Sequence, residues 1–289
     1  MGGRVRNVLV HLEPGPGLES VLACALAVAR RFGSHLEGLH LRAGRPDIVA
    51  AGADGFVAAA PELVSAFERE AAARAEAART AFTAFCRRHG IPLDEPRPPG
   101  EIWARFRVEP ASVAGALAAR ARVFDLVVVA RPRTDAPGAA LAVLEAALFE
   151  SGRPLLVAPP APPTGPLGET VVIAWNGSTE TARAVAFAMP LLARARRVVV
   201  LAVPEGMVPG PDGEALAEAL HRHGLVVEHR PRAAEGRPVG AAILAETHAL
   251  GGDLLIKGAY THSRLRQMIF GGATSHLLQH ADLPMLMAN

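Results

Sequence analysis

The sequence predicts an α/β protein made of two doubly wound domains in tandem, each with a five-stranded parallel sheet. First, short apolar runs alternate with helix-length segments along the whole chain, the pattern of parallel strands covered by helices on both faces. Second, "DLVVVARP…ESGRPLLVAPP" in the first half is repeated as "DLLIKGAY…QHADLPMLMAN" in the second. Third, the proline-rich stretch "APPAPPTGPLG" between the halves is typical of a domain boundary.

These observations divide the chain into a first domain over residues 1–160, a linker over 161–168 and a second domain over 169–289. In the first domain the apolar runs predict strands over 6–12, 35–41, 102–108, 124–132 and 153–159. Helices are expected over 20–33, with Ser20 as N-cap and Gly33 at the end, and over 61–89, 111–122 and 138–152. The Ala/Gly-rich segment 42–60 is interpreted as a loop.

The same order of elements restarts after the linker. Strands are expected over 169–178, 196–204, 225–231, 253–258 and 284–289. Helices are expected over 179–195, 212–224 and 237–252, and from about Ala273. Pro190 is expected to kink the first of these helices or to end its first part.

Composition excludes several classes of protein. Half of the 289 residues are hydrophobic, which supports a packed core rather than disorder. The formal net charge of +2 does not indicate a nucleic-acid partner, and no apolar run has membrane-spanning length. Cys24 and Cys86 lack a CxxC spacing and are interpreted as buried thiols of a reducing compartment. We therefore expect a cytoplasmic protein without a nucleic-acid or membrane partner.

Ligands of such sheets bind at the carboxyl ends of the strands, which directs attention to the strand ends of the second domain. The first strand ends in Asn176, Gly177 and Ser178, and the second ends near Val203. A glycine-bearing loop follows the fourth strand. Its candidate nucleotide-binding residues are Gly258, Thr261, Gly271, Gly272 and Thr274, the last two at the start of a helix. A helix N-terminus offers unpaired N–H groups and partial positive charge to a phosphate.

This loop resembles that of the universal stress protein family, in a tandem two-domain form, and the resemblance covers essentially the whole chain. Nucleotide-binding members carry G-x2-G-x9-G-[S/T] after the fourth strand and an Asp at the end of the first. Here the spacing is kept, but Thr261 replaces the second Gly, Gly272 the Ser or Thr, and Asn176 the Asp. Asn176 loses the charge of a carboxylate, and Thr261 cannot adopt positive φ without strain.

The resemblance implies an adenine-nucleotide alpha-hydrolase-like fold and a cytoplasmic stress-response regulator. Its second domain would bind ATP or AMP, with Mg²⁺. The two domains would pair through their last strands as an intramolecular pseudo-dimer, and whole chains could form a homodimer or bind a regulatory protein. The alternative is a nucleotide-free interaction module that binds a protein partner or a small apolar ligand. Slow ATP hydrolysis is the third and weakest hypothesis, because no general base or metal ligand can be identified.

Other residues have simpler interpretations. "NGST" is favourable capping chemistry, so Asn176 and Ser178 are also expected to cap the next helix. His276 and His280 share a helix face but lack a third ligand, and no metal site is assigned. The first domain has no glycine loop, and His11 and Glu13 stand at the end of its first strand. It is expected to serve as a structural partner rather than as a nucleotide site.

Overall fold

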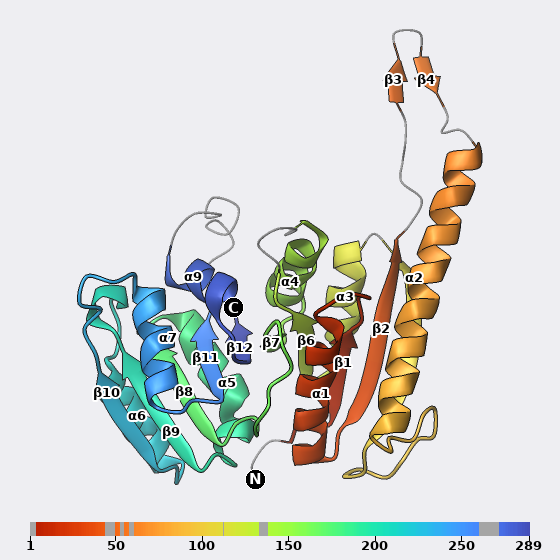
Figure 1. The fold of residues 1–289 in the computed structure, drawn as a ribbon. Coiled ribbons are helices and arrows are strands. Elements are labelled where there is room, and N and C mark those ends of the chain that lie inside the picture. The colour runs from red at the N-terminus through yellow and green to blue at the C-terminus, as the bar shows by residue number, and fades with distance from the viewer. Residues whose placement is uncertain are drawn as a thin grey trace.

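The computed structural model describes residues 4–43, 50–52, 55–57, 61–111, 113–132, 138–259 and 272–289. Its centre is a ten-stranded sheet in the order β10-β9-β8-β11-β12-β7-β6-β1-β2-β5 (Figure 1). The five strands of the first half and the five of the second occupy separate sides of this sheet. Each half has the same internal order, so the α/β fold of two doubly wound units is confirmed.

The first half begins with β1 (Asn7–His11), which lies between β2 and β6 in the sheet. The other strands of its main sheet are β2 (His35–Ala43), β5 (Trp103–Ala111), β6 (Leu126–Ala130) and β7 (Leu155–Ala158). Its helices are α1 (Leu18–Phe32), α2 (Pro61–Arg88), α3 (Val113–Ala121) and α4 (Gly138–Glu150). The long helix α2 reaches beyond the sheet toward the small hairpin of β3 (Ala50–Gly52) and β4 (Gly55–Val57) (Figure 1).

The second half repeats this order. Its strands are β8 (Thr170–Trp175), β9 (Arg197–Ala202), β10 (Val227–Pro231), β11 (Leu254–Gly258) and β12 (Met285–Ala288). Its helices are α5 (Thr179–Leu192), the 3-10 turn η1 (Pro204–Gly206), α6 (Gly213–Arg222), α7 (Val239–Ala249) and α9 (Ala273–His280). Within each half, neighbouring strands of the ten-stranded sheet run parallel.

The halves join through their last strands. β12 pairs with β7 in the antiparallel sense, with Leu286 opposite Leu156, and this is the antiparallel pairing of the ten-stranded sheet. It relates the halves as two subunits would be related across a shared sheet. The expected intramolecular pseudo-dimer is therefore confirmed.

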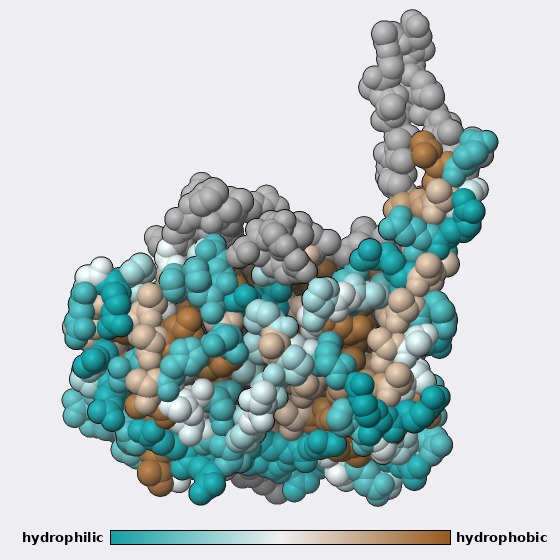
Figure 2. Space-filling model, in the orientation of Figure 1, coloured by the Kyte–Doolittle hydropathy of each residue, from teal (hydrophilic) through white to brown (hydrophobic). Residues whose placement is uncertain are grey.

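Apolar side chains fill a layer on each face of the sheet. One core contains side chains of α1, α2, α5 and α6, and the other contains side chains of α3, α4, α7 and α9. Because strand side chains alternate between faces, consecutive residues of β6 and β11 belong to different cores. Apolar atoms also reach the surface beside α2 (Figure 2). Among the described residues, no helix is both long and apolar enough to cross a membrane.

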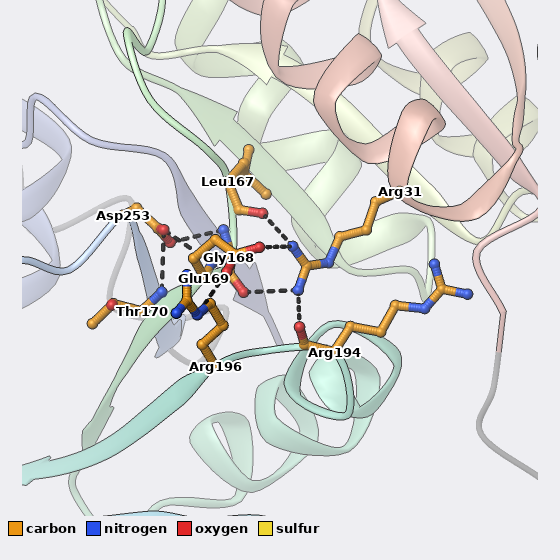
Figure 3. Close-up of polar contacts among 8 residues, drawn as sticks. All are labelled: Arg31, Leu167, Gly168, Glu169, Thr170, Arg194, Arg196 and Asp253. Carbon is orange, nitrogen blue, oxygen red and sulfur yellow. Dashed lines mark hydrogen bonds and ion pairs between the residues drawn. The ribbon is translucent and has the colours of Figure 1, made fainter.

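The repeated Asp of each half has a structural role. Asp125 accepts hydrogen bonds from the backbone N–H groups of Arg6 and Asn7, at 2.7 and 2.9 Å. Asp253 accepts three, from Gly168, Glu169 and Thr170, at 2.7, 2.9 and 3.1 Å (Figure 3). In each half this carboxylate fixes the start of the first strand against the start of the fourth. The repeat detected in the sequence therefore marks a conserved strand junction within the chain rather than a binding site.

Arg31 connects the halves at the same place. It belongs to α1 of the first half, and it donates to the carbonyl oxygens of Leu167, Gly168 and Arg194. Its Nη1 also lies 3.2 Å from Glu169 Oε1 (Figure 3). A single guanidinium thus satisfies backbone acceptors of the linker and of the second half, and so ties the linker to both.

Two local predictions were wrong. Ser20 lies inside α1 rather than at its N-cap, which is Gly17, and its hydroxyl donates to the carbonyl of Ala161. The segment interpreted as a loop contains the β3–β4 hairpin, whose three-residue strands are too short for a periodic signal. Pro190 lies inside α5, which continues to Leu192, and a kink there stays a prediction. Gly33 ends α1 as expected, with φ of 64°.

Candidate functional site

The strand order reverses twice, once in each half. In the second half β8 continues to β9 on one side and neighbours β11 on the other, so the carboxyl ends of β8 and β11 form the crevice where doubly wound sheets bind ligands. In the first half the carboxyl ends of β1 and β6 form the equivalent crevice. These two places are the candidate sites, and their side chains differ.

At the end of β8, three polar side chains bond to one another. Asn176 Oδ1 accepts from Thr181 Oγ1 at 2.6 Å and from the backbone N–H of Ser178 at 3.3 Å. Ser178 Oγ accepts from the backbone N–H of Thr181 at 3.2 Å and caps α5. The expected capping role is confirmed. With Oδ1 engaged, the Nδ2 group of Asn176 is the part of this side chain that can still serve a ligand.

The segment after β9 lies against this turn. Val203 is buried, and its carbonyl accepts from Gly206 in η1. Further on, Val208 donates its N–H to the carbonyl of Asn176 at 2.9 Å. Gly177 has φ of 80°, and a Cβ there would lie 3.1 Å from the Val208 carbonyl oxygen. Gly177 is therefore required by a turn that only glycine adopts easily and by this close approach.

Gly258 ends β11 and faces α5. A Cβ at this position would lie 2.3 Å from the backbone nitrogen of Thr181, so no side chain fits between strand and helix. Close packing is sufficient reason for this glycine. A role in phosphate binding stays a prediction.

The helix α9 begins beyond the loop. Gly272 is its N-cap with φ of 97°, and as a glycine it supplies no side-chain cap. Thr274, in the first turn, is buried. Thr261 and Gly271 lie outside the described residues.

Lys257 is the residue that sequence reasoning missed. It is the only lysine of the chain and the penultimate residue of β11, and it is only 7% exposed. Alternation places its side chain on the face of Leu255 and Ala259, the face that α7 and α9 cover. The available signal was a single charged residue inside the apolar strand "DLLIKG".

Burial dominates the electrostatics of Lys257. It lowers the pKa of the amine from 10.5 to about 8, and the nearby charge of Glu180 opposes this shift. At pH 7 the amine is therefore still mostly protonated. Among the described residues, no carboxylate lies within ion-pair distance of it. A buried cation without a paired carboxylate is costly, and an anionic ligand would offset that cost.

The equivalent crevice of the first half contains a cavity. Its volume is about 370 Å³, and its wall includes His11, the turn at residues 13–17, Val129 and Arg131. Val129 takes the place of Lys257, because each precedes the last residue of a five-residue strand that follows the repeated Asp. The cationic residue of one crevice is thus apolar in the other.

Metal-binding chemistry has little support in either half. Within the ranges that the structure describes, no group of three or more His, Cys, Asp or Glu could hold a metal ion. The rings of His276 and His280 stack at 4.2 Å between centroids, and His280 Nδ1 lies 2.9 Å from the carbonyl oxygen of His276. Both contacts lie within α9 and join the two histidines to each other.

Comparison with known proteins agrees with this architecture. The model of the universal stress protein family matches residues 169–289. A universal stress protein from Archaeoglobus fulgidus DSM 4304 has a similar structure, with a TM-score of 0.70, 14% identity, and coverage of 99% of this chain and 97% of that chain. A functionally unknown protein from Pseudomonas aeruginosa PAO1 matches with a TM-score of 0.54, 14% identity, and coverage of 98% and 92%.

No curated protein matches the sequence significantly. At 14% identity, the structural likeness shows a shared fold over nearly the whole chain. The family match gives the second half its identity, and the repeated strand order extends the same architecture to the first half. Residues 169–289 therefore match the universal stress protein family, and the first half repeats the strand order of this domain.

Proposed function

We propose that this protein is a stress-response regulator whose second half binds an adenine nucleotide, with the phosphates beside Lys257. The observation that carries the proposal is the buried amine of Lys257, which has no carboxylate within ion-pair distance among the described residues. A phosphate would provide the missing negative charge. The family match to residues 169–289 supports the placement of this function in the second half.

The surrounding groups suit the other parts of a nucleotide. The N-terminus of α9 presents the positive end of a helix dipole to phosphate oxygens. Asn176 Nδ2 can donate to a ribose hydroxyl, while Val203 supplies an apolar surface at the end of β9. Mg²⁺ would then bind through phosphate oxygens and water rather than through a protein cage.

We infer a binding role rather than a catalytic one. A hydrolase would need a group that activates water, and no side chain in this crevice is placed as a general base by the contacts described above. Lys257 is protonated at pH 7 and so suits charge pairing. Nucleotide binding would then change the surface that the second half presents to a regulatory partner.

The test begins with the protein as purified. It is denatured, and any released small molecule is identified by mass spectrometry. Calorimetry then follows the titration of ATP with Mg²⁺ into the wild type and into Lys257→Met and Arg183→Met. Arg183 is exposed on α5, so its variant removes the same formal charge from a solvent-exposed position.

The proposal predicts one nucleotide site per chain, at least about tenfold weaker in Lys257→Met, because a charge-assisted bond to phosphate is lost. Arg183→Met should bind as the wild type does. Equal loss in both variants would mean that net charge rather than the Lys257 site attracts the nucleotide. No bound molecule and no heat with the wild type would favour the alternative, a nucleotide-free interaction module.

A further inference from the structure

The crevice of the first half is built differently from that of the second. Three residues, Pro14, Gly15 and Pro16, separate Glu13 from Gly17, the N-cap of α1. At the equivalent place in the second half, one residue separates Asn176 from the N-cap. The longer turn forms part of the cavity wall.

The wall of this cavity is mainly apolar. It includes side chains of Val21 in α1, Val129 in β6, and Ala140 and Val143 in α4. Its volume of about 370 Å³ lies within the range of small-molecule pockets. The two prolines of the turn carry no N–H group, so this turn is a poor cradle for phosphate oxygens.

His11 lines this cavity and carries a buried polar atom. The residue is only 7% exposed, and its buried Nε2 has no hydrogen-bond partner among the described residues. Burial, and then the neighbouring His40, lower the pKa of His11 to about 4, so the ring is neutral at pH 7. A buried polar atom without a partner destabilises a fold, and a ligand that bonds to it removes this cost.

Arg131 gives the cavity a charge preference. Its Nη1 donates to the carbonyl of Ala281 at 2.9 Å, and no carboxylate lies within ion-pair distance of it among the described residues. Burial lowers the pKa of this guanidinium, and the charge of Asp282 opposes that shift. The other charges of the wall, Arg74 and Glu13, already form an ion pair with each other. Arg131 is thus the cation available to a ligand.

We propose that this cavity binds a small monocarboxylic acid with an apolar body. The body packs among Val21, Val129 and Val143, and the carboxylate pairs with Arg131. His11 Nε2 supplies a hydrogen bond to an oxygen of the ligand. This site is independent of Lys257, and its ligand class differs from that proposed for the second half.

The test uses two probes of equal length, octanoate and octan-1-ol, titrated into the full chain by calorimetry. Octanoate should bind at one site, at least about tenfold more tightly than the alcohol, because only the acid forms a charge-assisted bond. Intermolecular NOEs should connect octanoate protons to the methyl groups of Val21, Val129 and Val143. No binding, or binding without these NOEs, would overturn the proposal, and so would equal affinity for the alcohol.

Variants separate the contributions of the wall. Arg131→Met should weaken octanoate about tenfold and leave the alcohol unchanged. Ala140→Phe should abolish binding of both probes, because the ring fills the cavity, and its melting curve must show a folded protein. If Ala140→Phe does not fold, the NOEs of the wild type and Arg131→Met still decide the question. Unchanged octanoate affinity in Arg131→Met, or in a folded Ala140→Phe, would overturn the assignment.

Two further variants separate this site from the nucleotide site. His11→Phe should weaken octanoate and raise the melting temperature of the ligand-free protein, because the unpaired nitrogen is removed. Octanoate affinity unchanged in His11→Phe would contradict the role of Nε2. Lys257→Met should bind octanoate as the wild type does, whether or not the nucleotide proposal holds. Weaker octanoate binding by Lys257→Met would place the octanoate in the second half and contradict the assignment.

Discussion

The two halves share a strand order and a strand junction, yet their crevices differ in chemistry. At the end of the fourth strand, Lys257 and Gly258 of the second half correspond to Val129 and Ala130 of the first. At the end of the first strand the polar residue is instead in the first half. The registers of β1 with β6 and of β8 with β11 place the polar His11 at the position of the apolar Ala174.

The two halves therefore keep the same sheet framework while the side chains of their crevices differ. The residues that fix the first strand to the fourth within each half, Asp125 and Asp253, lie at the amino ends of the strands. The residues that differ lie at the carboxyl ends, where a change of side chain or of turn length does not disturb the sheet. This separation is consistent with our proposal of an anion site in one half and an apolar cavity in the other.

The first prediction concerns Lys257 and the pH dependence of the free energy of unfolding. Its folded-state pKa of about 8 lies below the unfolded value of 10.5, so between these values the unfolded chain binds more protons and stability rises with pH. The rise should be on the order of 3 kcal/mol, and it should be absent in Lys257→Met. Urea unfolding at several pH values compares the two proteins. A wild type and a variant with the same pH slope would show that the amine is solvated.

A second comparison concerns the last residue of the fourth strand. Gly258→Ala should destabilise the protein by about 2–3 kcal/mol, because its Cβ would meet the backbone nitrogen of Thr181 at 2.3 Å. The matched change in the first half, Ala130→Gly, should cost about 1 kcal/mol through backbone entropy. Denaturant unfolding of both variants measures the two losses of stability. Equal costs would mean that α5 can move away from β11.

The strand junctions provide the next comparison. Asp253→Asn should cost about 2 kcal/mol and Asp125→Asn about 1 kcal/mol, because Asp253 accepts three backbone hydrogen bonds and Asp125 accepts two. An amide places donors against backbone N–H groups, so part of each set is lost. Thermal melts of the two variants give the order. A larger loss for Asp125→Asn would contradict the expectation that the loss of stability follows the number of backbone hydrogen bonds.

The smallest effect concerns the helix caps. Ser178→Ala should cost about 1 kcal/mol, because it removes the hydrogen bond to the N–H of Thr181. In the first half Gly17→Ser should add only a few tenths of a kcal/mol, since a glycine N-cap is nearly as good as serine. There is room for the new side chain, because the nearest atom to a Cβ at residue 17 is that of Ala130 at 3.5 Å.

Much of the fold was predictable because its signals are local. Buried parallel strands appear as apolar runs, and the repeated Asp marks the same junction twice. The antiparallel pairing of β12 with β7 followed from the family resemblance, because no pattern within either strand specifies its partner across the molecule. The β3–β4 hairpin was missed because three-residue strands give no periodic signal.

The sites were harder to predict because their properties depend on three-dimensional surroundings. Asn176 and Ser178 could be interpreted as caps from sequence; Ser178 is the N-cap of α5, while Asn176 accepts from the Thr181 hydroxyl beside it. Lys257 was visible as the only lysine, but its burial and missing carboxylate partner required coordinates. The cavity beside His11 depends on the length of one turn and on two helices distant in sequence. No motif could have indicated it.

We propose that one repeated fold carries two sites of different ligand chemistry. A crossed titration tests this, in which ATP with Mg²⁺ and octanoate are each added to the wild type, Lys257→Met and Ala140→Phe. Lys257→Met should weaken ATP binding and keep octanoate, while folded Ala140→Phe should lose octanoate and keep ATP. Loss of both ligands in either folded variant, or of neither in both, would contradict it.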